Sequence, residues 1–336
     1  MDFRLSDEQS LLVETARSLF TRECPASLVR SVAADPGPAA HLFDRHLRAW
    51  VELAGGPLSD LMLFLVEAGA AVAPGPFLAT AGLFAPLLIA AGHDLADRAV
   101  SGDAVGTVAV AGKDGVWAAS SDTVRTQVID LHLVDYLALI RSTEEGPTLA
   151  VLAADAVERR PVETMDLART TFTIEVPDDL RGTAIDPIAC ADAIERMAVA
   201  VAAELVGVGR WMVDTAVAYA KERVQFDKPI GSFQAVQHSL VDAALAYERS
   251  AAAVAYAAMA VDAGHPDRHR AVHVAKAEAG AAARGAAKDA MQVLGGVGYT
   301  WEHDLHLRLR RAYADDAVCG TGSWHLDRLA DLLFAR

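Results

Sequence analysis

Residues 219–234 (YAKERVQFDKPIGSFQ) bring together three side chains that could bind a ligand. Arg223 and Phe226 lie three residues apart at the end of an Ala/Val-rich helical pattern, and Gln234 follows a turn marked by proline and glycine. A guanidinium offers a fork of donors to a phosphate, and an aromatic ring offers a flat face to another ring. Ser232 is a residue type that caps helix N-termini, so a new helix is predicted to start there. The stretch predicts a ligand-binding corner between two helices.

Arg223 also has a purely structural interpretation. Its guanidinium could form an ion pair with Glu222 or Asp227 and stabilise the C-terminus of its own helix. Both interpretations stay open on these residues alone.

A second candidate lies at residues 292–303 (QVLGGVGYTWEH). Gln292 closes another helical pattern, and it is followed by Gly295 and Gly296, which can adopt left-handed backbone angles and let a ligand approach closely. Because these glycines follow a helix and not a strand, they cannot form the dinucleotide-binding turn of a Rossmann fold. The motif is either a ligand-binding turn or an ordinary glycine helix end.

His303 and His306 raise the question of a metal site. Their spacing of three residues without a third convergent ligand is weak evidence, so no metal is expected. The better interpretation is a helix that starts at Asp304 and exposes a charged face. That face carries Arg308, Arg310 and Arg311.

The elements that must position these residues fall into three predicted domains. Residues 1–98 are predicted to form a helical domain, residues 99–185 a reduced β-domain, and residues 186–336 a four-helix bundle. The predicted N-terminal helices cover 7–23, 39–53, 57–73 and 77–92. The predicted strands cover 107–111, 126–129, 136–140, 148–152 and 170–176. The predicted bundle helices cover 187–222, 232–263, 267–294 and 305–335. The fold class is therefore mainly α with a small β-domain.

The amino-acid composition and net charge argue against several classes of function. The 336 residues carry 30 basic and 45 acidic side chains, and the net charge of −15 opposes binding to nucleic acid or to anionic membranes. Prolines break the uncharged stretch 68–93 into pieces too short to span a bilayer, and no signal peptide is expected at the start. Three distant cysteines without a CxxC indicate neither a disulfide framework nor a zinc site, so a cytoplasmic protein is expected.

The stretch at 219–234 resembles the signature of the FAD-dependent acyl-CoA dehydrogenase family, and residues 292–303 are similar to that family's second C-terminal motif. Residues 1–9 are also of the family's type. The resemblance is strong from about residue 186 onward and weak between about residues 100 and 185. It implies the family's helical, β, helical architecture and a set of contacts to the adenosine diphosphate part of FAD held mainly by a neighbouring subunit. The residues so implied are Arg223, Phe226, Gln234, Gln292, Gly295 and Gly296.

The chain departs from the family where the chemistry takes place. The family removes the α-proton of an acyl-CoA with a glutamate while a hydride passes to the flavin. The usual positions of that glutamate align here on Cys319 and Met197, neither of which can take up a proton as a carboxylate does. A shift of one or two residues turns a helical side chain by about 100–200°, so nearby acids are predicted to be surface or helix-start charges. These acids are Glu195, Glu204, Asp315 and Asp316.

The middle segment departs as well. It lacks the Thr-Glu-Pro-x-Ala-Gly-Ser-Asp loop and the Trp-Ile-Thr-Asn strand that wall the flavin ring in the family. The resemblance thus implies a subunit without a catalytic residue of its own, similar to the short subunits of α2β2 acyl-CoA dehydrogenases that oxidise bulky thioesters such as steroid side chains. A full-length paralogue would bind most of the acyl-CoA and supply the base, and an electron-transfer flavoprotein would accept the electrons.

Two alternatives stay open. One is a self-sufficient homo-oligomeric dehydrogenase that uses Asp316 or Glu195 as its base. The other is a structural assembly partner that touches no flavin.

Overall fold

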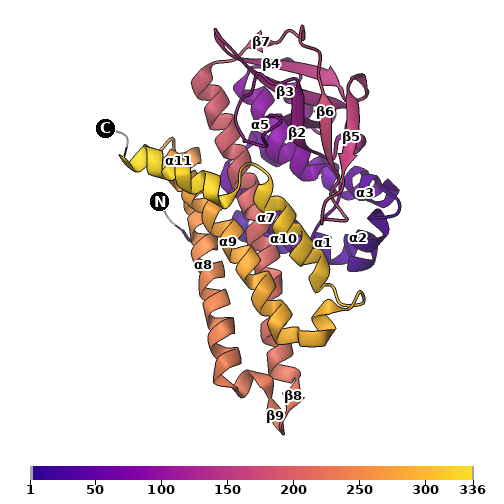
Figure 1. The fold of residues 1–336 in the computed structure, drawn as a ribbon, viewed down its shortest axis with the longest axis vertical. Coiled ribbons are helices and arrows are strands. Elements are labelled where there is room, and N and C mark those ends of the chain that lie inside the picture. Colours follow the sequence, from indigo (N-terminus) through magenta and orange to yellow (C-terminus); the bar gives the residue numbers. More distant parts are fainter. Residues whose placement is uncertain (1–2, 335–336) are drawn as a thin grey trace.

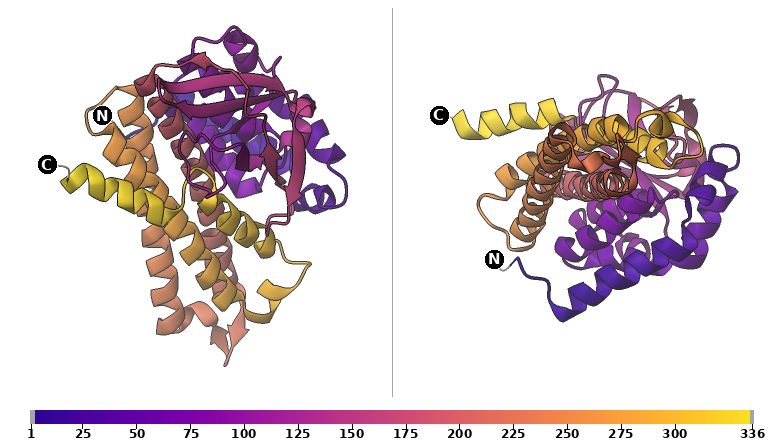
Figure 2. Two further views of the ribbon diagram at one scale, coloured as in Figure 1. Left: turned by 45° about the horizontal axis from the view of Figure 1, so that its top comes forward. Right: turned by 90° about the horizontal axis from the view of Figure 1, so that it is seen from below.

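The computed structural model describes residues 3–334, and helices precede and follow a small β-region as predicted (Figure 1). The fold class, mainly α with a small β-domain, is confirmed. Figure 2 shows the sheets packed with the N-terminal helices at one end of the long helix α7, while α8 and α9 extend toward the other end. The predicted boundary at 185/186 falls between β7 and α7, whereas the one at 98/99 falls within the short helix α6 (Ala96–Val100); we retain the three-domain division as our proposal.

The N-terminal segment begins with a capping box. The Ser6 hydroxyl accepts from the Gln9 amide at 3.1 Å, and the Gln9 side chain accepts from the Ser6 amide at 3.2 Å. The helix predicted at 7–23 is confirmed, whereas those at 39–53 and 77–92 are interrupted by π and 3-10 turns, because apolar periodicity alone does not distinguish these forms from α-helix. The elements are α1 (Asp7–Glu23), α2 (Ala26–Val32), α3 (Gly37–Leu42), η1 (Phe43–Leu47), η2 (Arg48–Gly55), α4 (Leu58–Ala71), η3 (Leu78–Phe84), α5 (Ala85–Ala90) and α6 (Ala96–Val100).

The β-region consists of two small sheets, with strand orders β1-β3-β4-β7 and β2-β6-β5. Only the β1–β3 pair is parallel among the described strands, with Val108 opposite Ala138. Two strands of this region, β5 and β7, were not predicted. All residues of β5 are exposed, and its charges and proline leave no alternation of apolar and polar residues that would mark a strand in the sequence. The strands are β1 (Gly106–Ala109), β2 (Val124–Ile129), β3 (Tyr136–Thr143), β4 (Gly146–Ala153), β5 (Glu158–Val162), β6 (Thr171–Glu175) and β7 (Thr183–Ala184).

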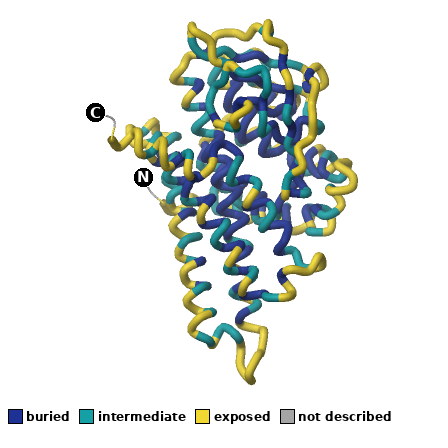
Figure 3. The backbone as a smooth tube through the Cα atoms, in the orientation of Figure 1, coloured by how far each residue is buried: buried dark blue, intermediate teal, exposed yellow. Residues whose placement is uncertain are grey.

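The C-terminal helices pack around α7, which is buried along most of its length (Figure 3). They are α7 (Pro187–Glu222), α8 (Gln234–Asp262), α9 (Arg268–Leu294), α10 (Leu305–Ala317) and α11 (Gly322–Phe334). The prediction of a single helix over 305–335 is wrong, because residues 318–321 are not helical and separate α10 from α11. Residue 335 of that prediction lies outside the described residues. Cys319 and Gly320 have φ angles of 59° and 93°, which no α-helix accommodates. Lys276 holds this break by donating to the carbonyls of Asp316 and Gly320 at 3.0 and 2.9 Å.

Glycines set how closely α4 and α7 cross. A Cβ atom on Gly69 would lie 2.1 Å from the Glu204 carbonyl oxygen, and one on Gly207 would lie 1.9 Å from that of Val66. Since no side chain fits there, the two helices contact through their backbones. Within residues 3–334, no helix is long and apolar enough to span a membrane.

Candidate functional site

The first candidate segment forms the free tip of the bundle, at the lower end of Figure 1. Strands β8 (Val224–Gln225) and β9 (Lys228–Pro229) pair there through a two-residue turn at Phe226 and Asp227. Both turn residues have left-handed backbones, with φ angles of 53° and 62°. This suits a tight hairpin but is unfavourable for a bulky aromatic residue. The Phe226 side chain is nevertheless 86% exposed, so the hairpin presents it to solvent.

Arg223 lies at the C-cap of α7, where its amide donates to the Tyr219 carbonyl at 2.8 Å. Its guanidinium has no hydrogen bond or ion pair with any residue in the range 3–334. The pairs with Glu222 or Asp227 that the structural interpretation requires are therefore absent from this part of the chain. As far as residues 3–334 are concerned, all five N–H donors of the guanidinium are available to a ligand.

The predicted helix cap at Ser232 is wrong. The Ser232 hydroxyl donates to the Pro229 carbonyl at 2.7 Å within the 3-10 turn η6 (Ile230–Ser232), and α8 begins at Gln234 without a side-chain cap. A local bond to an upstream carbonyl competes with the capping geometry. Gln234, as the first helical residue, exposes its amide to solvent.

The second candidate segment lies at the same end of the bundle. The antiparallel helices α8 and α9 are joined near this end by the Ser239 hydroxyl, which donates to Asp289 at 3.0 Å. Gln292 follows on the exposed face of α9, and the chain then turns through η7 (Gly295–Tyr299). No atom lies within 4 Å of the position that a Cβ would occupy on Gly295 or Gly296, counting residues 3–334. The backbone there is open to an approaching group.

The positions where the family places its glutamate hold no usable base. Cys319 and Met197 are both 0% exposed. Burial raises the pKa of the Cys319 thiol far above its ordinary value, so the thiol stays protonated. Neither side chain can accept a substrate proton.

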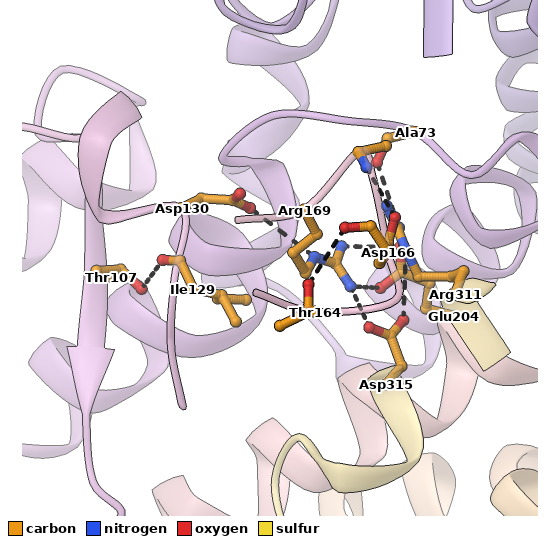
Figure 4. Close-up of polar contacts among 11 residues, drawn as sticks. Ala73, Thr107, Ile129, Asp130, Thr164, Asp166, Arg169, Glu204, Arg311 and Asp315 are labelled. Carbon is orange, nitrogen blue, oxygen red and sulfur yellow. Dashed lines mark hydrogen bonds and ion pairs between the residues drawn. The ribbon is translucent and has the colours of Figure 1, made fainter. Parts of the chain in front are cut away.

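A buried ionic network occupies the junction between the β-region, α7 and α10 (Figure 4). The Arg169 guanidinium donates to both oxygens of Glu204 at 2.9 and 3.0 Å and to Asp315 at 2.6 Å. Arg311 donates to Glu204 at 2.7 Å and forms an ion pair with Asp166. All five side chains are buried.

This network overturns two predictions. Glu204 and Asp315 are not surface or helix-start charges, and the arginine face of α10 is not solvated, because Arg308 and Arg311 are 6% and 0% exposed. The reason is that α10 packs against α7 beneath the loop before β6, so its charges find partners inside the protein. Asp304 also lies at the N-cap of α10 without a side-chain cap bond, since Arg30 donates to its carboxylate at 2.5 Å.

The other two acids are engaged as well. Glu195 contacts His269 Nδ1 at 2.7 and 2.8 Å, and burial raises the Glu195 pKa despite this bond. Asp316 forms an ion pair with Arg284. With Asp192, whose carboxylate contacts Arg268 at 3.2 Å, Glu195 and His269 place their possible metal-ligand atoms within 4.8 Å of one another. Hydrogen bonds and ion pairs already satisfy this group without a metal.

A cavity of about 430 Å³ lies between the second sheet and α10, where the chain could hold a flavin of its own. Its charged walls are Lys113, Asp114, Arg169 and Asp315. Arg169 is already bonded to Glu204 and Asp315, and the two aspartates oppose a negatively charged pyrophosphate. The residues of this cavity do not fit FAD. The bundle tip fits better, because within residues 3–334 the Arg223 guanidinium has no hydrogen-bond or ion-pair partner and the Phe226 ring is exposed, with only an edge-to-face contact to Phe233.

Asp130 gives the network a pH dependence that can be measured. Burial raises the Asp130 pKa to about 7, offset in part by Arg169 and Arg311 and reinforced by Asp166. Since this pKa lies above the unfolded value, ionising Asp130 destabilises the fold as the pH rises from about 4 to about 7. We expect Asp130→Asn to stabilise the protein on the order of 2 kcal/mol at pH 8 and hardly at pH 4. Asparagine also tolerates the φ angle of 54° at this position. Urea unfolding at both pH values measures the difference, and an equal gain at the two would contradict it.

Comparison with known proteins shows which proteins this chain is similar to. The profile of the family described as "Acyl-CoA dehydrogenase, C-terminal domain" matches residues 189–334. The acyl-CoA dehydrogenase IpdE2 of Mycobacterium tuberculosis is 30% identical over 329 residues, which is 91% of this chain and 91% of that protein. The acyl-CoA dehydrogenase FadE34 of the same species is 36% identical over 81% of this chain, which spans only 38% of FadE34.

A solved structure shows the same fold over nearly the whole chain. It is named as the Tcur3481-Tcur3483 steroid ACAD G363A variant, with a TM-score of 0.87, 26% identity, and coverage of 97% of this chain and 98% of that chain. The profile match over the bundle and the 30% identity to IpdE2 over 91% of both chains lead to one conclusion. This chain belongs to the acyl-CoA dehydrogenase family.

Proposed function

We propose that the chain is a subunit of an FAD-dependent acyl-CoA dehydrogenase complex and contributes to the FAD site of a catalytic partner subunit. One asymmetry carries the proposal. Phe226 and the two glutamines of the bundle tip are exposed and the Arg223 guanidinium has no partner within residues 3–334, whereas the positions aligned with the catalytic glutamate hold a buried thiol and a buried thioether. Such a chain can complete a neighbour's site but cannot abstract a proton in its own.

FAD, when bound, would supply the acceptor for the substrate hydride. The residues of this chain would bind and orient its adenosine diphosphate part. Arg223 would donate to the pyrophosphate, Phe226 would pack against a ring, and the backbone at Gly295 and Gly296 would allow close approach. The exposed amides of Gln234 and Gln292 would donate or accept at the rim.

The exposed face next to the tip favours a partner subunit. Val224, Val241 and Leu245 are 52%, 63% and 62% exposed along the hairpin and the outer side of α8. Val241 and Leu245 are four residues apart and so share one face of α8, and exposed apolar side chains on one face favour a protein–protein interface. We propose a paralogue of this chain as the partner, in an α2β2 assembly with an electron-transfer flavoprotein as electron acceptor and a cytoplasmic location.

The substrate class follows from the relatives. The Tcur3481-Tcur3483 structure is named as that of a steroid ACAD, and its name joins two protein designations. We propose that the complex dehydrogenates a bulky, steroid-derived acyl-CoA thioester. A self-sufficient enzyme is the second candidate, but the acids it would recruit, Asp316 and Glu195, are held by Arg284 and His269.

The test is purification of the chain alone and after co-expression with the full-length paralogue. We expect FAD absorbance and dehydrogenase turnover only in the co-purified complex. Stoichiometric FAD and turnover in the isolated chain would refute the proposal. A complex that keeps full FAD affinity after all tip residues are replaced would instead support a purely structural partner.

Gly296→Ala separates a ligand contact from a helix end. No atom of residues 3–334 lies within 4 Å of a Cβ added to Gly296, so the substitution is expected to leave the isolated chain folded and equally stable. In the complex, the added methyl group would meet the cofactor and weaken FAD retention by about tenfold, the effect of one poor steric contact of about 1.4 kcal/mol. Dialysis followed by flavin absorbance measures the retention. Unchanged retention would show that no group approaches Gly296.

A further inference from the structure

A cavity of about 640 Å³ lies outside the proposed FAD site, between α1, α4, α7 and α10. Its volume is within the range of small-molecule sites. Phe20 and Trp211 provide its large apolar walls, and arginines from three helices reach it. These arginines are Arg17, Arg210 and Arg308.

Arg308 is the unusual member of this wall. It is 6% exposed, its Nε and Nη2 atoms donate to the Ala70 carbonyl at 3.2 and 3.0 Å, and its guanidinium lies 4.1 Å from the centre of the Trp211 ring. Its Nη1 atom is buried and has no hydrogen-bond partner among residues 3–334. A charged donor left in this state is costly, so it calls for a further partner, which a bound anion in the cavity can supply.

The charged side chains at and next to the cavity carry one more positive than negative charge. Glu67 is shared by Arg17 at 3.0 Å and Arg210 at 2.7 Å, and Asp304 is bound by Arg30 at 2.5 Å. Asp214 is the third carboxylate of the wall. The lining thus holds three guanidiniums and three carboxylates, and Arg30, which lies outside the lining, adds a fourth guanidinium by pairing with Asp304. This local excess of one positive charge occurs in a chain whose net charge is −15.

We propose that this cavity binds a small organic carboxylate whose anionic end pairs with Arg308 and whose apolar body lies against Phe20 and Trp211. A single carboxylate charge balances the local excess, whereas the two charges of a phosphate monoester exceed it. Phe20 and Trp211 favour an apolar, flat body over a sugar. The proposal does not depend on the FAD contacts at the tip.

Trp211 makes the site observable by fluorescence. The full-length chain would be titrated with benzoate, with benzyl alcohol as the neutral probe of the same shape and with inorganic phosphate as the competing anion. We expect a saturable change with benzoate only, and its loss in Trp211→Phe. An equal response to benzyl alcohol, a stronger response to phosphate, or no saturable response to benzoate would overturn the proposal.

Variants then test the role of the guanidinium. Arg308→Met is expected to raise the benzoate dissociation constant at least tenfold, whereas Arg310→Met, a partly exposed neighbour on the same helix, leaves it unchanged. If Arg308→Met does not fold by circular dichroism, Arg17→Met removes another guanidinium from an exposed position and is expected to weaken benzoate about threefold. Unchanged affinity in the folded variant refutes the assignment. Loss of benzoate binding when the paralogue is added would also refute it, since the cavity would then belong to the subunit interface.

Discussion

Complexes that carry Arg223→Ala are expected to bind FAD about 10- to 100-fold more weakly than the unsubstituted complex. The reason is that the Arg223 guanidinium has no partner within residues 3–334, so its donors are free for the pyrophosphate. A charge-assisted hydrogen bond contributes about 1.5–3 kcal/mol, which corresponds to this loss of affinity. The stability of the isolated chain should hardly change, because the substitution removes no hydrogen bond or ion pair among residues 3–334. Flavin release at increasing dilution measures the dissociation constant.

Arg270→Ala is the matched control. Arg270 is an exposed arginine in the first turn of α9, at the opposite end of the helix from Gln292, and its only ion pair among the described residues is with Asp267 at 3.6 Å. The control removes the same charge and should leave FAD affinity unchanged. If both variants release FAD equally, the effect is one of net charge. If neither does, the chain is a structural partner that does not reach the cofactor.

Replacing Arg311 by methionine is expected to lower the free energy of unfolding by about 3–5 kcal/mol. Methionine has a similar length and fits the buried space, but it leaves Glu204 and Asp166 without the guanidinium that Figure 4 shows between them. Unpaired buried carboxylates are far costlier than a lost surface ion pair, which contributes at most about 1 kcal/mol. Urea unfolding monitored by circular dichroism measures the difference.

Two further variants make this result specific. Arg310→Met changes the neighbouring arginine, which donates to the Met165 carbonyl at 3.1 Å from a partly exposed position, and should cost less than about 1 kcal/mol. Adding Glu204→Gln to Arg311→Met should recover part of the loss, because the orphaned charge is then removed as well. Equal losses for Arg310→Met and Arg311→Met would show that the network does not hold the β-region to the bundle.

Local chemistry made much of the fold predictable. The helices at 7–23 and 187–222 were predicted with the bounds observed, because each begins at a residue whose side chain caps the first turn, Ser6 or Asp186. Strong apolar periodicity also predicted three of the four bundle helices closely. The sequence could not show the break at 318–321, because that break depends on Lys276, which lies 40 residues earlier along the chain and donates to the Asp316 carbonyl across the bundle.

The residues at the bundle tip were also accessible from sequence, since Arg223, Phe226 and Gln234 stand close together along the chain. Whether they act on FAD stays a prediction. Their availability was decided by the tertiary structure, which leaves Arg223 without a partner within residues 3–334 and holds Phe226 in a left-handed turn. A carboxylate close to an arginine in the sequence forms an ion pair with it only if the backbone orients the two side chains toward each other.

The sequence by itself determined the helical, β, helical order, because hydrophobic periodicity and turn residues are local properties of the chain. That Cys319 and Met197 stand where the family places its glutamate stays a prediction of the resemblance. Only the tertiary structure decided the state of the remaining acids. Glu204, Asp166 and Asp315 come from three distant segments, and their burial against Arg169 and Arg311 depends on contacts more than 30 residues apart along the chain. No local pattern marks such a network, since a charge in a sequence looks the same whether its partner is water or a guanidinium.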